Sequence, residues 1–134
     1  MSGSERRSQV LEIAAGEFAN HGLHGASIDA IAHEAGITQA YVFRMFGTKK
    51  ALFLELVGVA FDRFSVGMAQ AATDARGLRA LALMGAQYYE LLADRTTLLL
   101  QLQGFAACGD SEVRDLVRAR LARMWEHGGR CGTP

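Results

Sequence analysis

The sequence predicts an all-α protein. Its 134 residues contain a single proline, at the last position, so no predicted helix is interrupted by proline. Apolar residues recur at spacings of three and four along most of the chain, and no segment shows the strict alternation that is typical of a half-buried strand. Half of the residues are hydrophobic, which is enough for one buried core or for a small domain joined to a modest helical body.

The first predicted helix covers about Glu5 to Asn20. Val10, Ala14 and Phe18 fall on one apolar stripe of this helix. We therefore expect the helix to brace the two that follow it.

Two short helices joined by a tight turn are predicted between Ser27 and Phe46. Ser27 is a favourable N-cap residue for the first helix, and Gly36 occupies the position at which a left-handed residue ends a helix. Thr38 can cap the second helix, and Gly47 closes it. A helix, a turn with glycine and a second helix form the helix-turn-helix layout, in which the second helix lies in the DNA major groove.

Four further helices are predicted after this hairpin. One long helix covers Lys49 to about Ala72, and amphipathic helices follow at about 78–92, 98–107 and 112–127. The Gly128-Gly129 pair is expected to end the last helix. The predicted organisation is therefore a helix-turn-helix domain at 1–52, a helical regulatory body at 53–128 and an irregular tail at 129–134.

The second helix of the hairpin has the chemistry of a DNA-reading surface. The segment from Thr38 to Lys50 contains cations and no carboxylate. Gln39 and Tyr41 lie near the start of the helix, which is the end that reaches base edges, and glutamine can bond adenine in a bidentate manner. A helical hairpin with a solvated basic end would show the same spacing, so this pattern alone leaves both interpretations open.

A longer ordered pattern resembles the DNA-binding domain of TetR-type transcriptional repressors. It comprises Leu11 to Phe18, then Gly22, and then the run from Ser27 to Leu52. The resemblance implies a double-stranded DNA operator as a partner. It also implies DNA contacts from the recognition helix and its flanks, namely Ser27, Thr38, Gln39, Ala40, Tyr41, Phe43, Arg44 and Lys49.

Two positions depart from the family pattern. Family members usually carry Tyr at the position of Phe43, and Tyr or His at the position of Met45, and these usual residues donate to phosphate. Phe and Met cannot donate, so phosphate contacts are expected to depend more on Arg44, Lys49 and backbone amides. Arg6 and Arg7 of the N-terminal arm either touch the DNA backbone or are simply solvated, and we favour the second interpretation.

The resemblance also implies a homodimer. TetR-type chains usually continue for two further long helices that form the dimer interface, and this sequence has no such pair. We therefore expect pairing through the last predicted helix, at 112–127, together with the helix at 98–107.

In this family the helical body binds a small-molecule inducer that releases DNA. The later helices combine apolar surface with a few polar groups, as expected of a small-molecule pocket. The same residues would also suit an ordinary core. The predicted ligand-lining residues are Met84, Tyr88, Tyr89, Gln101, Phe105 and Trp125.

Charge and cysteine content limit how the protein could bind DNA, where it is located and whether it holds a metal. The formal net charge is zero, so DNA binding would depend on a local basic patch and on two paired copies. No signal peptide or membrane span is visible, which predicts a cytoplasmic protein. Cys108 and Cys131 lack zinc spacing, and His21 and His24 straddle a glycine turn, so we expect no metal site and no cofactor.

Three function classes remain open. The leading interpretation is a sequence-specific DNA-binding repressor that is released by a small apolar ligand. The alternative is a truncated ligand-binding or protein-interaction module with little DNA affinity. The third is a small all-α enzyme, but the sequence contains no glycine-rich phosphate loop, nucleophile elbow or metal motif, and we do not expect an enzyme.

Overall fold

The computed structural model describes residues 2–71 and 77–132, and for residues 67–69, 71, 88, 91, 92 and 127–132 it describes the backbone alone. Within these ranges the chain forms seven α-helices and no strand, which confirms the predicted all-α class. In chain order the helices are α1 (Gly3–Gly25), α2 (Ile28–Ala35), α3 (Gln39–Phe46), α4 (Lys49–Ala71), α5 (Gly77–Ala93), α6 (Arg95–Ala106) and α7 (Ser111–Gly132).

Capping residues define the hairpin formed by α2 and α3. The hydroxyl oxygen of Ser27 accepts a hydrogen bond from the amide of Ala30 at 3.0 Å, and that of Thr38 accepts one from the amide of Tyr41 at 3.1 Å. Gly36 ends α2 with φ of 71°, in the left-handed region that glycine adopts without a steric penalty. The predicted caps and turn of the helix-turn-helix are therefore confirmed.

Two helices extend beyond their predicted ends. α1 continues past Asn20 to Gly25, with the non-helical residue Gly22 inside it as a kink. α7 continues through Gly128-Gly129 to Gly132, so the prediction of an irregular tail from residue 129 was wrong. A glycine in a helix costs only about 0.5–1 kcal/mol relative to alanine, and a long preceding helix can propagate through it. The predicted break after α4 lies outside the described residues.

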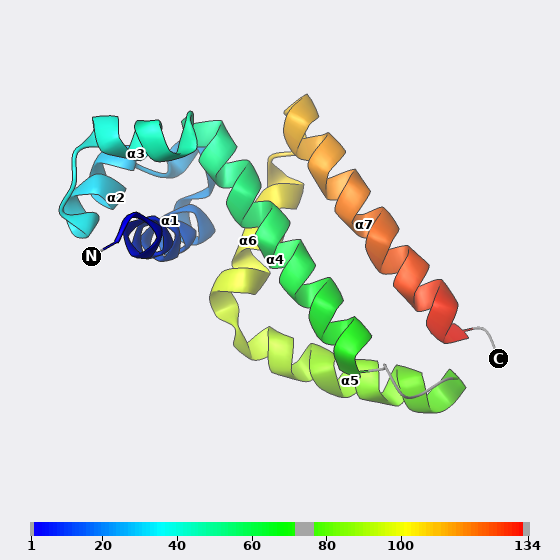
Figure 1. Ribbon diagram of the computed structural model, residues 1–134. Coiled ribbons are helices and arrows are strands. Elements are labelled where there is room, and N and C mark those ends of the chain that lie inside the picture. Colours follow the sequence, from blue (N-terminus) through cyan, green and yellow to red (C-terminus); the bar gives the residue numbers. More distant parts are fainter. Residues whose placement is uncertain (1, 72–76, 133–134) are drawn as a thin grey trace.

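The seven helices form two groups that share α4 (Figure 1). α1, α2 and α3 gather at one end of the molecule, and α4 leaves this group and runs diagonally beside α6 and α7. α5 crosses the far end of α4. Because α1 packs against α6 as well as against α2 and α4, the N-terminal helices and the later helices meet in one interface.

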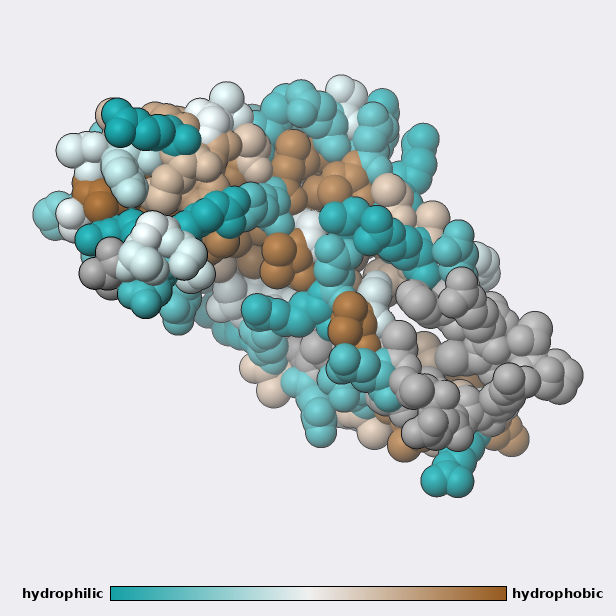
Figure 2. All heavy atoms as spheres, in the orientation of Figure 1, coloured by the Kyte–Doolittle hydropathy of each residue, from teal (hydrophilic) through white to brown (hydrophobic). Residues whose placement is uncertain are grey.

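One cluster of buried side chains continues from α1 to α7. Its largest fully buried members are Phe18, Phe53 and Phe61. The rings of Phe18 in α1 and Phe53 in α4 lie 5.5 Å apart between centroids at a tilt of 55°, a favourable aromatic geometry. In Figure 2 apolar side chains show between hydrophilic ones where the N-terminal helices meet α4.

Polar contacts also connect the two groups of helices. The side-chain amide of Gln103 in α6 donates to the carbonyl oxygen of Ala19 in α1 at 3.1 Å. The ammonium group of Lys50, at the start of α4, lies 3.1 Å from an Asp110 carboxylate oxygen and 2.8 Å from one of Glu112. The Lys50 contacts hold the start of α4 against the turn between α6 and α7 and the first turn of α7.

None of the described helices is both long enough and apolar enough to cross a membrane.

The close approach of α4, α6 and α7 at Gly104 gives a stability prediction. A Cβ atom at this position would lie 2.8 Å from Val57 Cγ1 and 3.4 Å from Val117 Cγ2. Gly104→Ala should therefore lower the free energy of unfolding by about 1–3 kcal/mol through overpacking, as measured by urea denaturation.

Gly16→Ala is the matched control, because nothing lies within 4 Å of an added Cβ at this position in α1. It should raise stability by about 0.5–1 kcal/mol through helix propensity alone. Equal stabilisation by both substitutions would contradict the packing described at Gly104.

Candidate nucleic-acid interface

α3 is attached to the protein along one narrow side. Val42 is its one buried residue, and Met45 and Phe46 are partly buried against the core cluster. The other side of α3 is open to solvent. Five of the predicted DNA-contact residues lie on this exposed side, namely Gln39, Ala40, Tyr41, Phe43 and Arg44.

Three further predicted contacts lie at helix N-termini. Ser27 and Thr38 are the exposed N-caps of α2 and α3, and Lys49 is the first residue of α4. A capping hydroxyl accepts from its own helix and keeps its proton free to donate. Helix N-termini also favour anions through their free amides and dipoles. These positions have the chemistry needed to bind phosphate.

The two lysines at the start of α4 are in different surroundings. The Lys49 ammonium group donates to the carbonyl oxygen of His24 at 3.3 Å and has no carboxylate partner among the described contacts. Lys50 is paired with Glu112 and Asp110, and hydrogen bonds to these two carboxylates raise the pKa of Lys50 above its ordinary value. Lys49 is thus the better available cation for a phosphate.

Gln39 has a specific partner on the neighbouring helix. Its side-chain nitrogen donates to a carboxylate oxygen of Asp29 in α2 at 3.0 Å. The pair joins the second residue of α2 to the first residue of α3. The sequence alone does not predict a role for Asp29, because the contact depends on how the two helices cross.

The two departures from the family pattern lie in different environments. Phe43 is 39% exposed on the outer side of α3, so its ring is free to make an apolar contact. Met45 is half-buried against the core cluster. Neither side chain can donate to phosphate, as predicted from their chemistry.

Arg6 and Arg7 both contact other parts of the protein, contrary to the simple solvated interpretation. One Arg6 guanidinium nitrogen donates to the carbonyl oxygen of Ala35, at the end of α2, at 3.2 Å. Arg7 pairs with Glu55 of α4 at 2.7 Å, and its guanidinium carbon lies 4.9 Å from the centre of the Phe46 ring. Arg7 therefore connects α1 to the end of α3 and to α4.

The predicted ligand-lining residues do not meet in one described cavity. Tyr89 and Trp125 are 78% and 85% exposed. Gln101 is buried, and its side-chain nitrogen donates to the carbonyl oxygen of Ala60 at 3.4 Å. Phe105 packs edge-on against Phe61 with 5.7 Å between ring centroids.

The two remaining predicted ligand-lining residues, Met84 and Tyr88, do not complete a described ligand cavity with the other four. Met84 is half-buried in α5, and the side chain of Tyr88 lies outside the described residues. Among the described residues, no group of three or more His, Cys, Asp or Glu side chains is placed to hold a metal ion.

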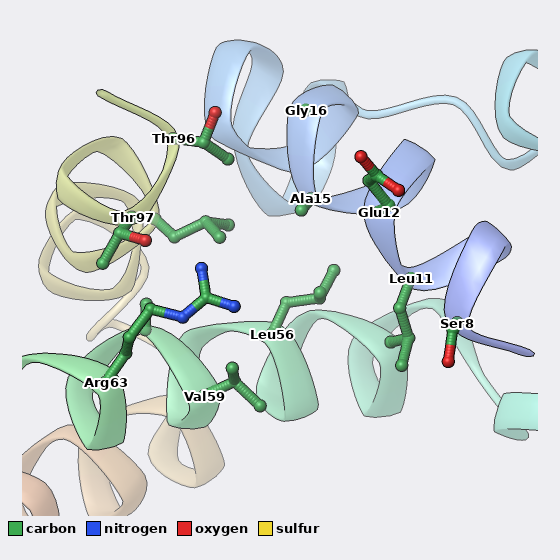
Figure 3. Close-up of a pocket in the computed structure, with 12 residues that line it drawn as sticks. Ser8, Leu11, Glu12, Ala15, Gly16, Leu56, Val59, Arg63, Thr96 and Thr97 are labelled. Carbon is green, nitrogen blue, oxygen red and sulfur yellow. The ribbon is translucent and has the colours of Figure 1, made fainter. Parts of the chain in front are cut away.

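A cavity of about 650 Å³ lies elsewhere, between α1, α4 and α6. Leu11, Leu56 and Leu100 contribute apolar wall, and Figure 3 shows the Arg63 guanidinium directed into the space. Thr97 lines the same end and donates its hydroxyl proton to Asp94 at 2.6 Å. This hydrogen bond is the main reason why the pKa of Asp94 is lower than usual. Sequence periodicity could not identify the cavity, because its walls come from three separate helices.

Part of the sequence is similar to a known family. Residues 10–56 match the model of the bacterial regulatory proteins of the tetR family. An uncharacterized HTH-type transcriptional regulator of Bacillus subtilis, YdgC, is 40% identical over 55 residues, covering 41% of this chain and 28% of the relative. The HTH-type transcriptional activator FasR of Mycolicibacterium smegmatis is 34% identical over 67 residues. This match covers 50% of this chain and 31% of the relative.

A solved structure from Mesorhizobium loti, assigned to the TetR-family transcriptional regulators, shares the fold. Its TM-score is 0.81 at 20% identity, and the match covers 98% of this chain and 68% of that one. The chain spans under a third of the length of the two curated relatives. The sequence match falls on α1 to the first turns of α4, the segment that displays the exposed side of α3. Residues 10–56 therefore match the N-terminal domain of the tetR family of bacterial regulatory proteins.

Proposed function

We propose that the chain is a sequence-specific DNA-binding repressor that is released from DNA by a small, largely apolar ligand. The observation that carries the proposal is the exposed side of α3, which has no carboxylate and stands on a domain that matches the tetR family. A short helix with one buried residue offers most of its side chains to a partner. Repression would follow because a protein seated on an operator excludes other proteins from the same DNA.

The proposed DNA complex places α3 in the major groove. Gln39 and Tyr41, in the first turn of α3, would meet base edges, and Arg44 would meet guanine or phosphate. Ser27, Thr38 and Lys49 would bind phosphates on either side of the groove, where the helix N-termini point. The zero net charge of the chain makes this local patch the source of affinity.

A two-fold operator requires two hairpins held about 34–36 Å apart, or at a multiple of a helical turn. We assign pairing to α7, whose outer side carries Leu121 and Trp125 at 39% and 85% exposure. These residues line a largely apolar surface hollow together with Met124, Ala122 and Arg118. A symmetric dimer would bury this surface from both copies.

The cavity between α1, α4 and α6 is the proposed ligand site, in place of the dispersed residues predicted from sequence. A ligand there would touch α1 of the DNA-binding domain and α6 of the body at once. Its apolar part would contact the leucine wall, and one acceptor group would face Arg63. Displacing α1 relative to α4 would change how the α2–α3 hairpin is presented.

Two other outcomes are distinguishable from repression. FasR is named an activator, so a reporter gene under the chain's own operator must show whether expression falls or rises on binding. A truncated module without useful DNA affinity would neither lower nor raise expression of the reporter.

Substitutions on α3 and α4 test the DNA contacts. Lys49→Ala should weaken binding to all DNA sequences and reduce the salt slope by about one unit, because one phosphate contact is lost. Gln39→Ala should cost about 1–3 kcal/mol on the preferred sequence and little on others. Fluorescence anisotropy at several salt concentrations measures both effects.

Arg79→Ala is the control for these two variants, since it removes an exposed cation from α5, outside the proposed DNA, pairing and ligand surfaces. It should leave affinity and salt slope unchanged. If Lys49→Ala and Gln39→Ala behave like Arg79→Ala, the assignment of the DNA surface is wrong.

Sedimentation tests the pairing surface. The wild-type chain should dimerise at tens of micromolar, and Leu121→Glu should shift it to monomer by placing charge in the apolar surface of α7. Val66→Glu is a matched control on an exposed position of α4. A wild-type monomer would favour the truncated module, and a dimer unaffected by Leu121→Glu would move the interface elsewhere.

Binding of 1-anilinonaphthalene-8-sulfonate tests the cavity, because this probe combines apolar rings with one anionic group. Val59→Asp adds a carboxylate to an exposed part of the cavity wall and should lower the affinity of the probe about tenfold. Val66→Asp, on the same helix but outside the lining, should not change it. Equal binding to the three proteins would exclude this cavity as the probe's site.

A further inference from the structure

The geometry points to Asp29 as a specificity-determining residue, which orients the Gln39 amide so that it reads adenine. The inference rests on the proposed placement of α3 in the major groove. It starts from the 3.0 Å contact between the Gln39 side-chain nitrogen and an Asp29 carboxylate oxygen.

Charge chemistry sets the direction of the Gln39 amide. An ionised carboxylate only accepts hydrogen bonds, so only the NH₂ end of the amide can face Asp29. Of the two N–H groups, the one that points away from the amide oxygen can donate its hydrogen bond to Asp29. The amide oxygen and the other N–H then remain together on the open edge of the side chain.

This open edge is complementary to one base. Adenine presents the N6 amino donor and the N7 acceptor in the major groove, whereas guanine presents two acceptors, N7 and O6. An amide oxygen beside an N–H satisfies both groups of adenine. On guanine the same edge would set the amide oxygen against O6, and a flip of the amide would break its bond to Asp29.

The positions of the two residues are fixed by the hairpin itself. Asp29 lies in the first turn of α2, where the helix N-terminus favours a negative charge. α2 and α3 are joined by the Gly36 turn, in which the Ile37 amide donates to the carbonyl oxygen of Ala32 at 3.0 Å. The Asp29–Gln39 contact thus joins the two N-terminal turns of the hairpin.

The Asp29 carboxylate should also weaken sequence-independent binding to DNA. A negative charge beside the proposed DNA surface repels phosphate whatever the base sequence. Asp29 should therefore lower binding to every sequence while improving discrimination. A residue with a purely structural role would not produce opposite changes in these two quantities.

The test compares Asp29→Asn with Glu34→Gln and Gln39→Ala. Glu34 is exposed on the same helix, so Glu34→Gln removes an equal charge without touching Gln39. The probes are a duplex that the wild-type chain selects from a random pool, its single-base-pair variants, and a scrambled duplex. The readout is the dissociation constant at fixed salt.

Asp29→Asn should bind the scrambled duplex more tightly than wild type does. It should also reduce the preference for adenine over guanine, at the base pair where Gln39→Ala acts, by roughly threefold to tenfold. Glu34→Gln should leave this preference unchanged. If Gln39→Ala reduces specific binding while Asp29→Asn keeps the full preference, the inference is overturned and the DNA surface stands.

If Gln39→Ala has no effect on specific binding, the proposed placement of α3 in the major groove is wrong, and the DNA measurements no longer test the role of Asp29. A measurement without DNA then still decides whether the contact exists. The Gln39 side-chain NH₂ resonances, assigned by their loss in Gln39→Ala, should shift in Asp29→Asn and stay in place in Glu34→Gln. Unshifted resonances in Asp29→Asn would overturn the contact itself.

Discussion

The packing of Phe18 against Phe53 is the contact on which the rest of the structure depends. Both rings are fully buried, and they join the middle of α1 to the first turns of α4. Burying a phenylalanine contributes about 1.5–3 kcal/mol, so the pair is a substantial part of the stability of a small domain. With α1 and α4 fixed, the α2–α3 hairpin has a base to pack against, and α6 has a surface of α1 to contact.

α3 shows why this base is needed. A helix of eight residues is not stable in water by itself, since isolated helices are marginal below about 12–15 residues. α3 buries Val42 and is held at its ends, by the Thr38 cap at the start and by Arg7 over the Phe46 ring at the end. The protein thus keeps the outer side of α3 free of core packing, which leaves those side chains available for recognition.

The same scaffold connects the hairpin to the later helices through polar groups. Gln103 reaches the α1 backbone, and Lys50 reaches the carboxylates of Asp110 and Glu112. These contacts cross the boundary between the predicted domain at 1–52 and the predicted body, and the buried cluster crosses it as well. A change in the position of α6 would therefore act directly on α1 and on the start of α4.

The local features of this fold could be predicted from the sequence. Ser27, Gly36 and Thr38 have strong positional preferences, so the hairpin and its caps could be predicted from single residues. The predicted contact residues on α3 came from the family resemblance rather than from the spacing. Val10, Ala14 and Phe18 are all buried, as their stripe on α1 predicted.

Contacts between helices could not be predicted in this way. Periodicity indicates which side of a helix is apolar but not which helix covers it. The predicted ligand-lining set therefore combines the exposed Tyr89 and Trp125 with the buried Gln101. The Asp29–Gln39 contact and the Arg7 contacts depend on crossing geometry that no local pattern records. Gly128-Gly129 has a low helix propensity, yet α7 continues through it.

We propose that the exposed side of α3 and the adjoining helix N-termini bind DNA. Titration of the ¹⁵N-labelled chain with its selected duplex, followed by backbone amide shifts, tests it most directly. We expect the largest shifts at Ser27, at residues 38–44 and at Lys49. Shifts concentrated on α5 and α7, with α3 unchanged, would contradict it.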